Sequence, residues 1–284
     1  MKMIDKFFEM QRERYRMLVN RRTGMPRPWT TDPILDAYRF CNVFREDDKT
    51  TTWFRENLRN PLNEMAICGA LLRATVAFRW FNRIASGEKI KDMLAAGRWD
   101  SKEAEKALFL QEPVVTGAFI VKTPAGMDKL RGVLWCIDQI APHCYDIEAN
   151  HTPGETTMEA TWKALRNYPY MGPFMAHEVV TDLSFTWMLK DAPDRNTWTN
   201  MGPGATKGMG YIVHGDEEYW NSNSAQDQEE MTRHARAILQ EAAYDNRWPS
   251  AWPRWDLHTV EFGLCEFAKY QHALEGKKLK RRYQ

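Results

Sequence analysis

Apolar side chains recur at helical spacing along most of the chain, and this pattern predicts a mainly α-helical protein. The first segment has one apolar face and one arginine-rich face, and its apolar positions are Ile4, Phe8, Tyr15 and Leu18. Capping residues and prolines mark further helix starts, and glycine or proline marks several ends. The predicted helices are Ile4–Val19, Pro33 to about Glu46, Asn63–Ser86, Ser101–Gln111, Met127–Ile140, Glu155–Leu165, Pro173–Leu189, Gln226–Tyr244 and Asp256–Leu274.

The candidate strand is the apolar and β-branched run Val114–Val121, although a buried helix or an extended connection would show the same pattern. The connections between helices lack the long polar composition of an interdomain tether, and no internal repeat is visible. We therefore expect one compact helical catalytic domain over residues 1–276, followed by a basic tail at 277–284.

The composition of the 284 residues predicts a well-filled core, because 43% are hydrophobic and 27% are charged. No apolar run approaches the roughly 20 residues needed to cross a bilayer, and the first residues lack the apolar stretch of a signal peptide. The five cysteines are scattered without a CxxC pair, which excludes a zinc framework and a disulfide scaffold. We expect a cytoplasmic protein with no membrane partner and no metal site.

The net charge of +1 does not by itself indicate a nucleic-acid-binding protein, but the basic residues gather near both ends of the chain. Such clusters can follow DNA phosphates, and a solvated helix face or a disordered tail explains them equally well. The clustered residues are Arg12, Arg14, Arg16, Arg21, Arg22 and Arg27, and Lys277, Lys278, Lys280, Arg281 and Arg282.

A first set of polar residues lies on the helix predicted to begin at Pro33. Arg39, Asn42 and Glu46 are spaced three and four apart and would share a face, with Arg45 beside them and aromatic neighbours around them. Two arginines can hold a di- or polyphosphate, and Glu46 or Asp47 could act as a general base. The alternative is an ordinary surface strip with an Arg–Glu pair.

Residues 165–183 predict a helix, a tight turn at Gly172 and a second helix. This arrangement resembles the helix–hairpin–helix of DNA glycosylases, in which backbone amides and a helix N-terminus bind a DNA phosphate. We therefore expect Gly172, Pro173 and Phe174 to contact the DNA backbone. A helix–helix corner without a DNA contact is the alternative.

A glycine-rich segment opens a further helix at residues 201–209. Glycines let backbone N–H groups approach an anion, and a lysine adds positive charge. We predict a phosphate contact there, on DNA or on leaving pyrophosphate, through Gly202, Gly204, Lys207 and Gly208. A simple glycine turn is the alternative.

A fourth block places Glu266 between Leu264 and Phe267 on the last predicted helix. A partly buried carboxylate would have a raised pKa and could act as a base for an amine, although a structural salt bridge fits the same pattern. We assign Lys269, on the same helix, to DNA or phosphate binding.

These blocks resemble the alpha-glutamyl/putrescinyl thymine pyrophosphorylase superfamily, which includes the helical domain found in 5-hydroxymethyl-deoxyuridine DNA kinases. The densest match, from Pro28 to Trp53, carries PWTTDPIL, YRFCNVFREDD and a later TTTW, and it follows the pattern PWTxDPIL, YRFCNVFRExD, T and W. The superfamily also has a GPGxxxG block, matched at 202–208, and an LCEFxKY block, matched at 264–270. The resemblance extends over roughly Met3 to Gly276 and implies a compact helical fold similar to helix–hairpin–helix DNA glycosylases.

The resemblance implies a phage enzyme acting on DNA inside an infected bacterial cell. Such phages install 5-hydroxymethyluracil in DNA, a kinase (pyro)phosphorylates the hydroxymethyl group, and a transferase displaces the phosphate with an amine. Because the chain has no GxxxxGK[ST] sequence, we expect the transferase step, without ATP. The expected partners are double-stranded DNA carrying modified thymine and an amino-acid or polyamine donor.

The implied chemistry needs the target base outside the DNA stack, arginines at the departing phosphate and a carboxylate to deprotonate the amine. The catalytic set we assign to it is Arg39, Asn42, Arg45, Glu46, Asp47 and Glu266. A thiolate of Cys41 adding to the ring could ease the departure further. Mg²⁺ is left open as a cofactor, since it often accompanies pyrophosphate but no dedicated ligand cluster is visible.

Two other functions fit parts of the sequence. A DNA glycosylase acting on a modified base could use Asp191 or Asp194, downstream of the predicted hairpin. A non-catalytic DNA-binding helical domain related to the 5-hydroxymethyluracil DNA kinases is the second alternative.

Overall fold

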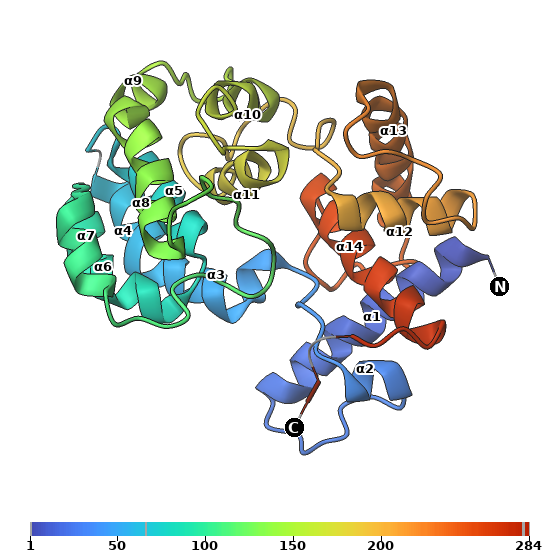
Figure 1. Cartoon of the computed structure of the whole chain (residues 1–284). Coiled ribbons are helices and arrows are strands. Elements are labelled where there is room, and N and C mark those ends of the chain that lie inside the picture. Colours follow the sequence, from blue (N-terminus) through green and yellow to red (C-terminus); the bar gives the residue numbers. More distant parts are fainter. Residues whose placement is uncertain (1, 66, 280–281, 284) are drawn as a thin grey trace. The chain divides into compact units, whose positions relative to one another are not determined.

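The computed structural model describes residues 2–65, 67–279 and 282–283, and over these residues the protein is helical, with an isolated antiparallel bridge between Tyr38 and Arg282 in place of any sheet (Figure 1). The predicted mainly α class is therefore confirmed. None of the helices in the described ranges is both long and apolar enough to span a membrane. The chain forms two compact units, one from residues 1–48 and 196–284 and the other from residues 49–195. The interpretation of residues 1–276 as one domain stays a prediction.

The first unit is built around α1 and α14, drawn in blue and red in Figure 1. Aromatic side chains from α1 and α14 form its core, in which Phe7 and Phe267 meet edge to face with ring centroids 5.6 Å apart. The ring of Trp255 stacks on that of Phe8, with the two ring centroids 5.6 Å apart. The elements of this unit are α1 (Met3–Arg22), α2 (Pro33–Ala37), η1 (Arg45–Asp47), α12 (Pro203–Val213), α13 (Ala225–Glu241) and α14 (Leu257–Leu274).

Helices α12 and α14 pack closely against each other because α12 carries glycine where the two backbones approach. A Cβ atom at Gly208 would overlap with the backbone carbonyl of Leu264, and one at Gly204 would overlap with Cys265 Sγ. A side chain at either position would therefore force the helices apart.

The second unit surrounds α5, whose side chains are almost all buried. The guanidinium of Arg79 on α5 forms a buried, two-pronged ion pair with Asp182 on α11. The elements of this unit are α3 (Lys49–Phe54), the π-helical turn η2 (Arg55–Arg59), α4 (Asn60–Met65), α5 (Ala70–Phe81), α6 (Ile84–Ala95), α7 (Ser101–Leu108), α8 (Lys129–Ile140), η3 (Ala141–His143), α9 (Cys144–Ala149), α10 (Met158–Leu165) and α11 (Pro173–Leu183).

The single long helix predicted over Asn63–Ser86 is wrong, because this stretch contributes to α4, α5 and α6. Gly69 begins α5 with a left-handed backbone at φ 80°, and Asn82 ends it with φ 43°. A helix cannot continue through a left-handed residue, so each of these positions interrupts it.

The candidate strand Val114–Val121 is an irregular connection. Its backbone bonds go to the surrounding helices: the N–H of Thr116 donates to Phe81 O at 2.8 Å, and the carbonyl of Val114 accepts from Ser86 Oγ at 2.6 Å. Val114 and Val121 are buried, so the apolar pattern reflects burial of an extended segment and not sheet pairing.

The close approach of α12 and α14 predicts that Gly208→Ala destabilises the protein by about 2 kcal/mol or more, through overpacking. At an unconstrained helix position the same change would stabilise by roughly 1 kcal/mol, so the sign of the effect separates the two cases. Denaturant unfolding followed by tryptophan fluorescence measures it.

The matched control is Gly117→Ala, where an added Cβ atom meets no other atom within 4 Å. It should change the free energy of unfolding by no more than about 0.5 kcal/mol. A Gly208→Ala variant as stable as this control would contradict the packing role.

Candidate functional site

The helix predicted from Pro33 to Glu46 is wrong beyond Ala37. At Tyr38 the backbone turns extended, with φ −116° and ψ 146°, and residues 38–44 are not helical. The segment instead satisfies its backbone groups with buried charged side chains from α1 and α14 and with Asp48. These contacts replace the helical hydrogen bonds that the spacing of Arg39, Asn42 and Glu46 implied.

Arg14, on α1, is the main anchor of this segment. Its side chain is 4% exposed. The guanidinium donates to Cys41 O from both Nε and Nη2, to Asn42 O at 2.8 Å and to Gln11 Oε1 at 2.5 Å. Gln11 in turn donates to Gly263 O on α14 at 3.1 Å. A buried guanidinium therefore holds the carbonyls of residues 41 and 42 in place.

Glu266 holds the same segment from the side of α14. Its side chain is 1% exposed, accepts the backbone N–H of Cys41 at 3.1 Å and forms an ion pair with Lys269. Burial by itself would raise the pKa of Glu266, but the positive charges of Lys269 and Arg14 and its hydrogen bonds outweigh burial and lower it. The expectation of a raised pKa is therefore wrong, and Glu266 is an ionised structural anchor.

Lys269 is likewise committed to this cluster. Burial would lower the pKa of its ammonium group, but the neighbouring charge of Glu266 raises it above the ordinary value for lysine. The ammonium therefore stays protonated on Glu266, and Lys269 neutralises a buried carboxylate. Its assignment to DNA or phosphate binding stays a prediction.

Asn42 connects this segment to the two aspartates that follow it. Its backbone N–H donates to Asp48 Oδ1 at 2.9 Å, and its side-chain amide donates to the same oxygen at 3.1 Å and to Asp47 O at 2.8 Å. Arg21 donates to Asn42 Oδ1 at 3.1 Å. The side chain of Asp47 pairs with Arg22 at 2.7 Å.

Asp48 has the electrostatic properties expected of a general base. Burial raises its pKa from 3.8 to about 6, with the negative charge of Glu266 adding to the rise, while the Asn42 N–H bond and the charges of Arg14 and Arg45 oppose it. A carboxyl group with a pKa of about 6 is mostly ionised at pH 7, yet it is more basic than an ordinary aspartate.

Burial and the neighbouring carboxylates of Glu266 and Asp48 raise the pKa of the Cys41 thiol well above its ordinary value. Cys41 is therefore a protonated thiol at neutral pH, which argues against its thiolate as the attacking group.

The structure brings only some of the predicted catalytic residues together. Asn42, Asp47 and Glu266 belong to one hydrogen-bonded network through Cys41 and Asp48. Arg45 and Glu46 lie in η1, immediately before Asp47. Arg39 is exposed and lies over the ring of Tyr283, with its Cζ atom 5.3 Å from the ring centroid.

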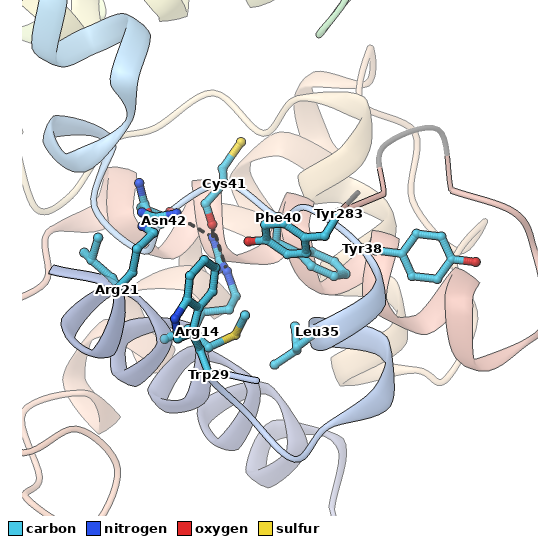
Figure 2. A pocket seen from close by; sticks show the side chains of 11 residues that line it. Arg14, Arg21, Trp29, Leu35, Tyr38, Phe40, Cys41, Asn42 and Tyr283 are labelled. Carbon is cyan, nitrogen blue, oxygen red and sulfur yellow. Dashed lines mark hydrogen bonds between the residues drawn. The ribbon is translucent and has the colours of Figure 1, made fainter. Parts of the chain in front are cut away.

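A small hollow borders this network in the first unit (Figure 2). Its volume is about 20 Å³, which is room for about one water molecule. Figure 2 shows the thiol of Cys41 turned away from the aromatic rings. The lining residues are Arg14, Met17, Leu18, Arg21, Trp29, Leu35, Tyr38, Phe40, Cys41, Asn42 and Tyr283.

The glycine-rich segment opens α12, as the sequence predicted, but its residues already have partners. The N–H of Gly202 donates to the carboxylate of Glu261 at 3.3 Å. Lys207 pairs with Glu217 at 3.3 Å and with Glu218 at 2.5 Å, which offsets its charge. Packing against α14 accounts for Gly204 and Gly208, and the phosphate contact of this segment stays a prediction.

Gly172 caps the N-terminus of α11 in the second unit, and Pro173 and Phe174 form the first turn. The left-handed residue of the preceding turn is Tyr170, at φ 62°, while Gly172 has φ −66°. Phe174 packs edge to face on Phe119 with centroids 5.0 Å apart. The DNA contact of this turn stays a prediction.

The two aspartates of the glycosylase alternative have structural or surface contacts. Asp194 accepts the backbone N–H groups of Met158 at 2.7 Å and Glu159 at 2.9 Å, so it caps α10. Asp191 is exposed beside Lys190. Among the residues that the structure describes, no group of three or more His, Cys, Asp or Glu side chains could hold a metal ion.

Sequence reasoning missed Arg14 and Asp48. The sequence pattern groups Arg14 with the basic residues 12–27, as a phosphate contact or part of a solvated face, although Phe7, Gln11 and Leu18 share its face of α1 and that face is buried. The helical spacing therefore held the signal. Asp48 is the final aspartate of the YRFCNVFRExD block, so the family resemblance included it, but no spacing argument singled it out as a site residue.

The buried pairing of Glu266 predicts that Glu266→Gln lowers the free energy of unfolding by about 3–5 kcal/mol at pH 7, since Lys269 and Arg14 lose their counter-charge. The folded-state pKa of Glu266 is depressed below 4.5. Its stabilisation is therefore present above that pH and is lost as the pH falls below it. The difference between wild type and variant should shrink below pH 4.5 in denaturant titrations.

The control for this prediction is Glu229→Gln on the exposed face of α13, which should change stability by no more than about 0.5 kcal/mol. Equal stability of the two variants would contradict the anchoring role of Glu266.

Comparisons with known proteins support one part of the resemblance seen in the sequence blocks, the relation to 5-hmdU DNA kinases. The family model described as the helical domain of 5-hmdU DNA kinase matches residues 1–279. The 5-hmdU DNA kinase of Bacillus phage SP10 is 25% identical over an alignment of 281 positions, and the match covers 92% of this chain and 43% of that protein. No solved structure matches the chain. The chain thus belongs to the family of the helical domain of 5-hmdU DNA kinases, and it spans less than half the length of the phage relative.

Proposed function

We propose that this protein is a phage DNA-modifying transferase, which displaces (pyro)phosphate from phosphorylated 5-hydroxymethyluracil in DNA with an amine. The observation that carries the proposal is the buried network that presents Asp48, with its pKa of about 6, next to Arg45 and Asn42. Family membership supports a role in phage thymine modification.

The proposed reaction is a substitution at the exocyclic methylene carbon of the base. The lone pair of the amine nitrogen forms the new C–N bond while the C–O bond breaks, and the electron pair leaves with pyrophosphate. The methylene carbon is allylic to the pyrimidine carbonyl. The pyrophosphate can therefore begin to leave before the amine attacks, and positive charge then builds on this carbon. Arg45 would stabilise the negative charge on the departing oxygen, with Arg39 as a second cation on this segment. Because the leaving group already carries the activation, no ATP is required.

Asp48 would take a proton from the ammonium group of the donor, which frees the nitrogen lone pair that then attacks the methylene carbon. Its raised pKa suits it better than Glu266, whose pKa is lowered. Glu266, Lys269 and Arg14 then act as positioning residues, because they fix the backbone from which Asn42 holds Asp48. Glu46 and Asp47 remain alternative bases on the same turn.

The remaining assignments complete the proposal. Backbone contacts from Gly172 to Phe174 and from the 202–208 segment would bind DNA phosphates, and the reacting base would leave the stack. These contacts would form with double-stranded DNA, and the donor would be an amino acid or a polyamine. The proposal includes a DNA-binding role for residues 165–183 like that of the helix–hairpin–helix in DNA glycosylases.

A second candidate is a DNA-binding helical domain without catalytic activity of its own. It is favoured by the family match, which names a helical domain. Its distinguishing behaviour is DNA binding without turnover.

The proposed function is tested by incubating duplex DNA containing pyrophosphorylated 5-hydroxymethyluracil with the protein and a panel of amino acids and polyamines, without ATP. Mass spectrometry of the digested nucleosides should show the base carrying the donor amine, and pyrophosphate should be released. Abasic sites would instead identify a glycosylase, and binding without any product would identify the DNA-binding domain. Reaction of the free nucleotide alone would contradict a polymer substrate.

The role of Asp48 predicts a pH effect on this reaction. Asp48→Asn should reduce the single-turnover rate at pH 7 by about 100-fold or more. In the wild-type protein the rate should rise as the pH increases through about 6, where Asp48 loses its proton. The variant should lack this rise and keep only the pH dependence of the donor amine.

Glu229→Gln, on α13, serves as the charge-matched control and should retain the wild-type profile. If Asp48→Asn keeps the rise near pH 6, another group is the base.

A further inference from the structure

The side chain of Tyr283 lies in an aromatic and cationic environment at the hollow of Figure 2. The guanidinium carbon of Arg27 lies 4.6 Å from its ring centroid, and that of Arg39 lies 5.3 Å from it. The indole of Trp29 meets the ring edge-on, with the ring centroids 5.9 Å apart and an angle of 82° between the ring planes. Cations and aromatic surfaces around a flat ring are what proteins use to hold a nucleobase.

Tyr283 packs against the edge of the core of the first unit, and among the described residues its backbone and its neighbour Arg282 add polar contacts at the surface. Its backbone N–H donates to Ala37 O at 3.1 Å. The neighbouring Arg282 donates to Tyr38 Oη at 2.9 Å and lies over the Tyr38 ring at 4.9 Å, both on the surface. Tyr283 itself is half-buried. Contacts of this kind are individually weak, because water competes for exposed hydrogen bonds and cations.

The space around Tyr283 leaves no room for a second ring. The hollow has a volume of about 20 Å³, whereas a pyrimidine is many times larger than the one water molecule that this volume admits. A base can therefore enter between Trp29 and Arg39 only where the phenol ring now lies.

The position is also adjacent to the proposed chemistry. Asn42, whose amide and backbone N–H hold Asp48, lines the same hollow as Tyr283. Phe40, which directly precedes Cys41 in the sequence, also lines the hollow. A ring in the place of Tyr283 would border the same hollow as Asn42, which is hydrogen-bonded to the carboxylate proposed as the base.

We propose that the place of the Tyr283 ring at this hollow is a nucleobase-binding site, with Trp29 and Phe40 from the lining and Arg27 and Arg39 over the ring, and that Tyr283 is an internal occupant which the extrahelical pyrimidine displaces. The identity of the base as a modified thymine rests on the proposed function, whereas the ring-binding site does not. An internal occupant weakens ligand binding, because the apparent affinity equals the intrinsic affinity multiplied by the fraction of molecules in which the site is open.

The test is a binding measurement without an amine donor, so that no transfer can occur. Fluorescence anisotropy would report the Kd for a duplex with one 5-hydroxymethyluracil opposite an abasic site, compared with the same duplex fully paired. Tyr283→Ala should bind the extrahelical-base duplex about fivefold to tenfold more tightly than wild type, by the occupancy relation above. The fully paired duplex should show a smaller change.

Three further variants make the result specific to the ring. Tyr283→Phe keeps the ring and should bind like wild type, and Tyr244→Ala removes an exposed tyrosine on another surface and should also bind like wild type. Trp29→Ala removes a wall of the site and should weaken binding of the extrahelical-base duplex. Thermal melting of each variant checks that it is folded.

Unchanged or weaker binding by folded Tyr283→Ala would overturn the proposal, because Tyr283 would then be a neutral residue or a DNA contact. The outcome is separable from that of the transfer assay. Tighter binding by Tyr283→Ala without any amine transfer would support the site and contradict the proposed function. Amine transfer by the wild type, together with unchanged DNA binding by Tyr283→Ala, would support the proposed function and contradict the nucleobase-binding site.

Discussion

The candidate site of the first unit depends on the buried guanidinium of Arg14. Its hydrogen bonds to the carbonyls of Cys41 and Asn42, together with the Glu266 carboxylate on the Cys41 N–H, hold an extended segment where helical spacing would predict a helix. A charge buried this deeply is stable only with several partners. Three chain segments distant in sequence must therefore fold together before the site exists.

This constraint separates two kinds of charged residue in the site. Glu266 and Lys269 neutralise each other and hold the backbone of residues 41 and 42. The pKa of Glu266 is therefore lowered and that of Lys269 is raised, so both side chains stay charged. Asp48 sits at the edge of the same cluster, where burial and the charge of Glu266 raise its pKa toward neutrality. Burial is thus the main cause of the raised pKa of Asp48, and the charge of Glu266 adds to it while that of Arg14 opposes it.

The glycines of α12 show how one motif can serve packing where a ligand contact was expected. Gly204 and Gly208 are spaced four apart and lie on the face that meets α14, so their lack of side chains lets the two backbones approach. This close approach also fixes the helix that carries Glu266 and Lys269. A phosphate contact by the same segment would use its N-terminal amides, where Gly202 already donates to Glu261.

The sequence by itself determined the helical class, most helix positions and the blocks that carry the family resemblance, because periodicity and capping are local properties of the chain. It placed Asn42, Asp47 and Glu266 among the functional candidates, and the structure joins these three in one network. Only the tertiary structure decided that the helix stops at Ala37, that Arg14 is buried and that Asp48 has a raised pKa. Each of these depends on desolvation and on charges brought from distant segments, which no local pattern records.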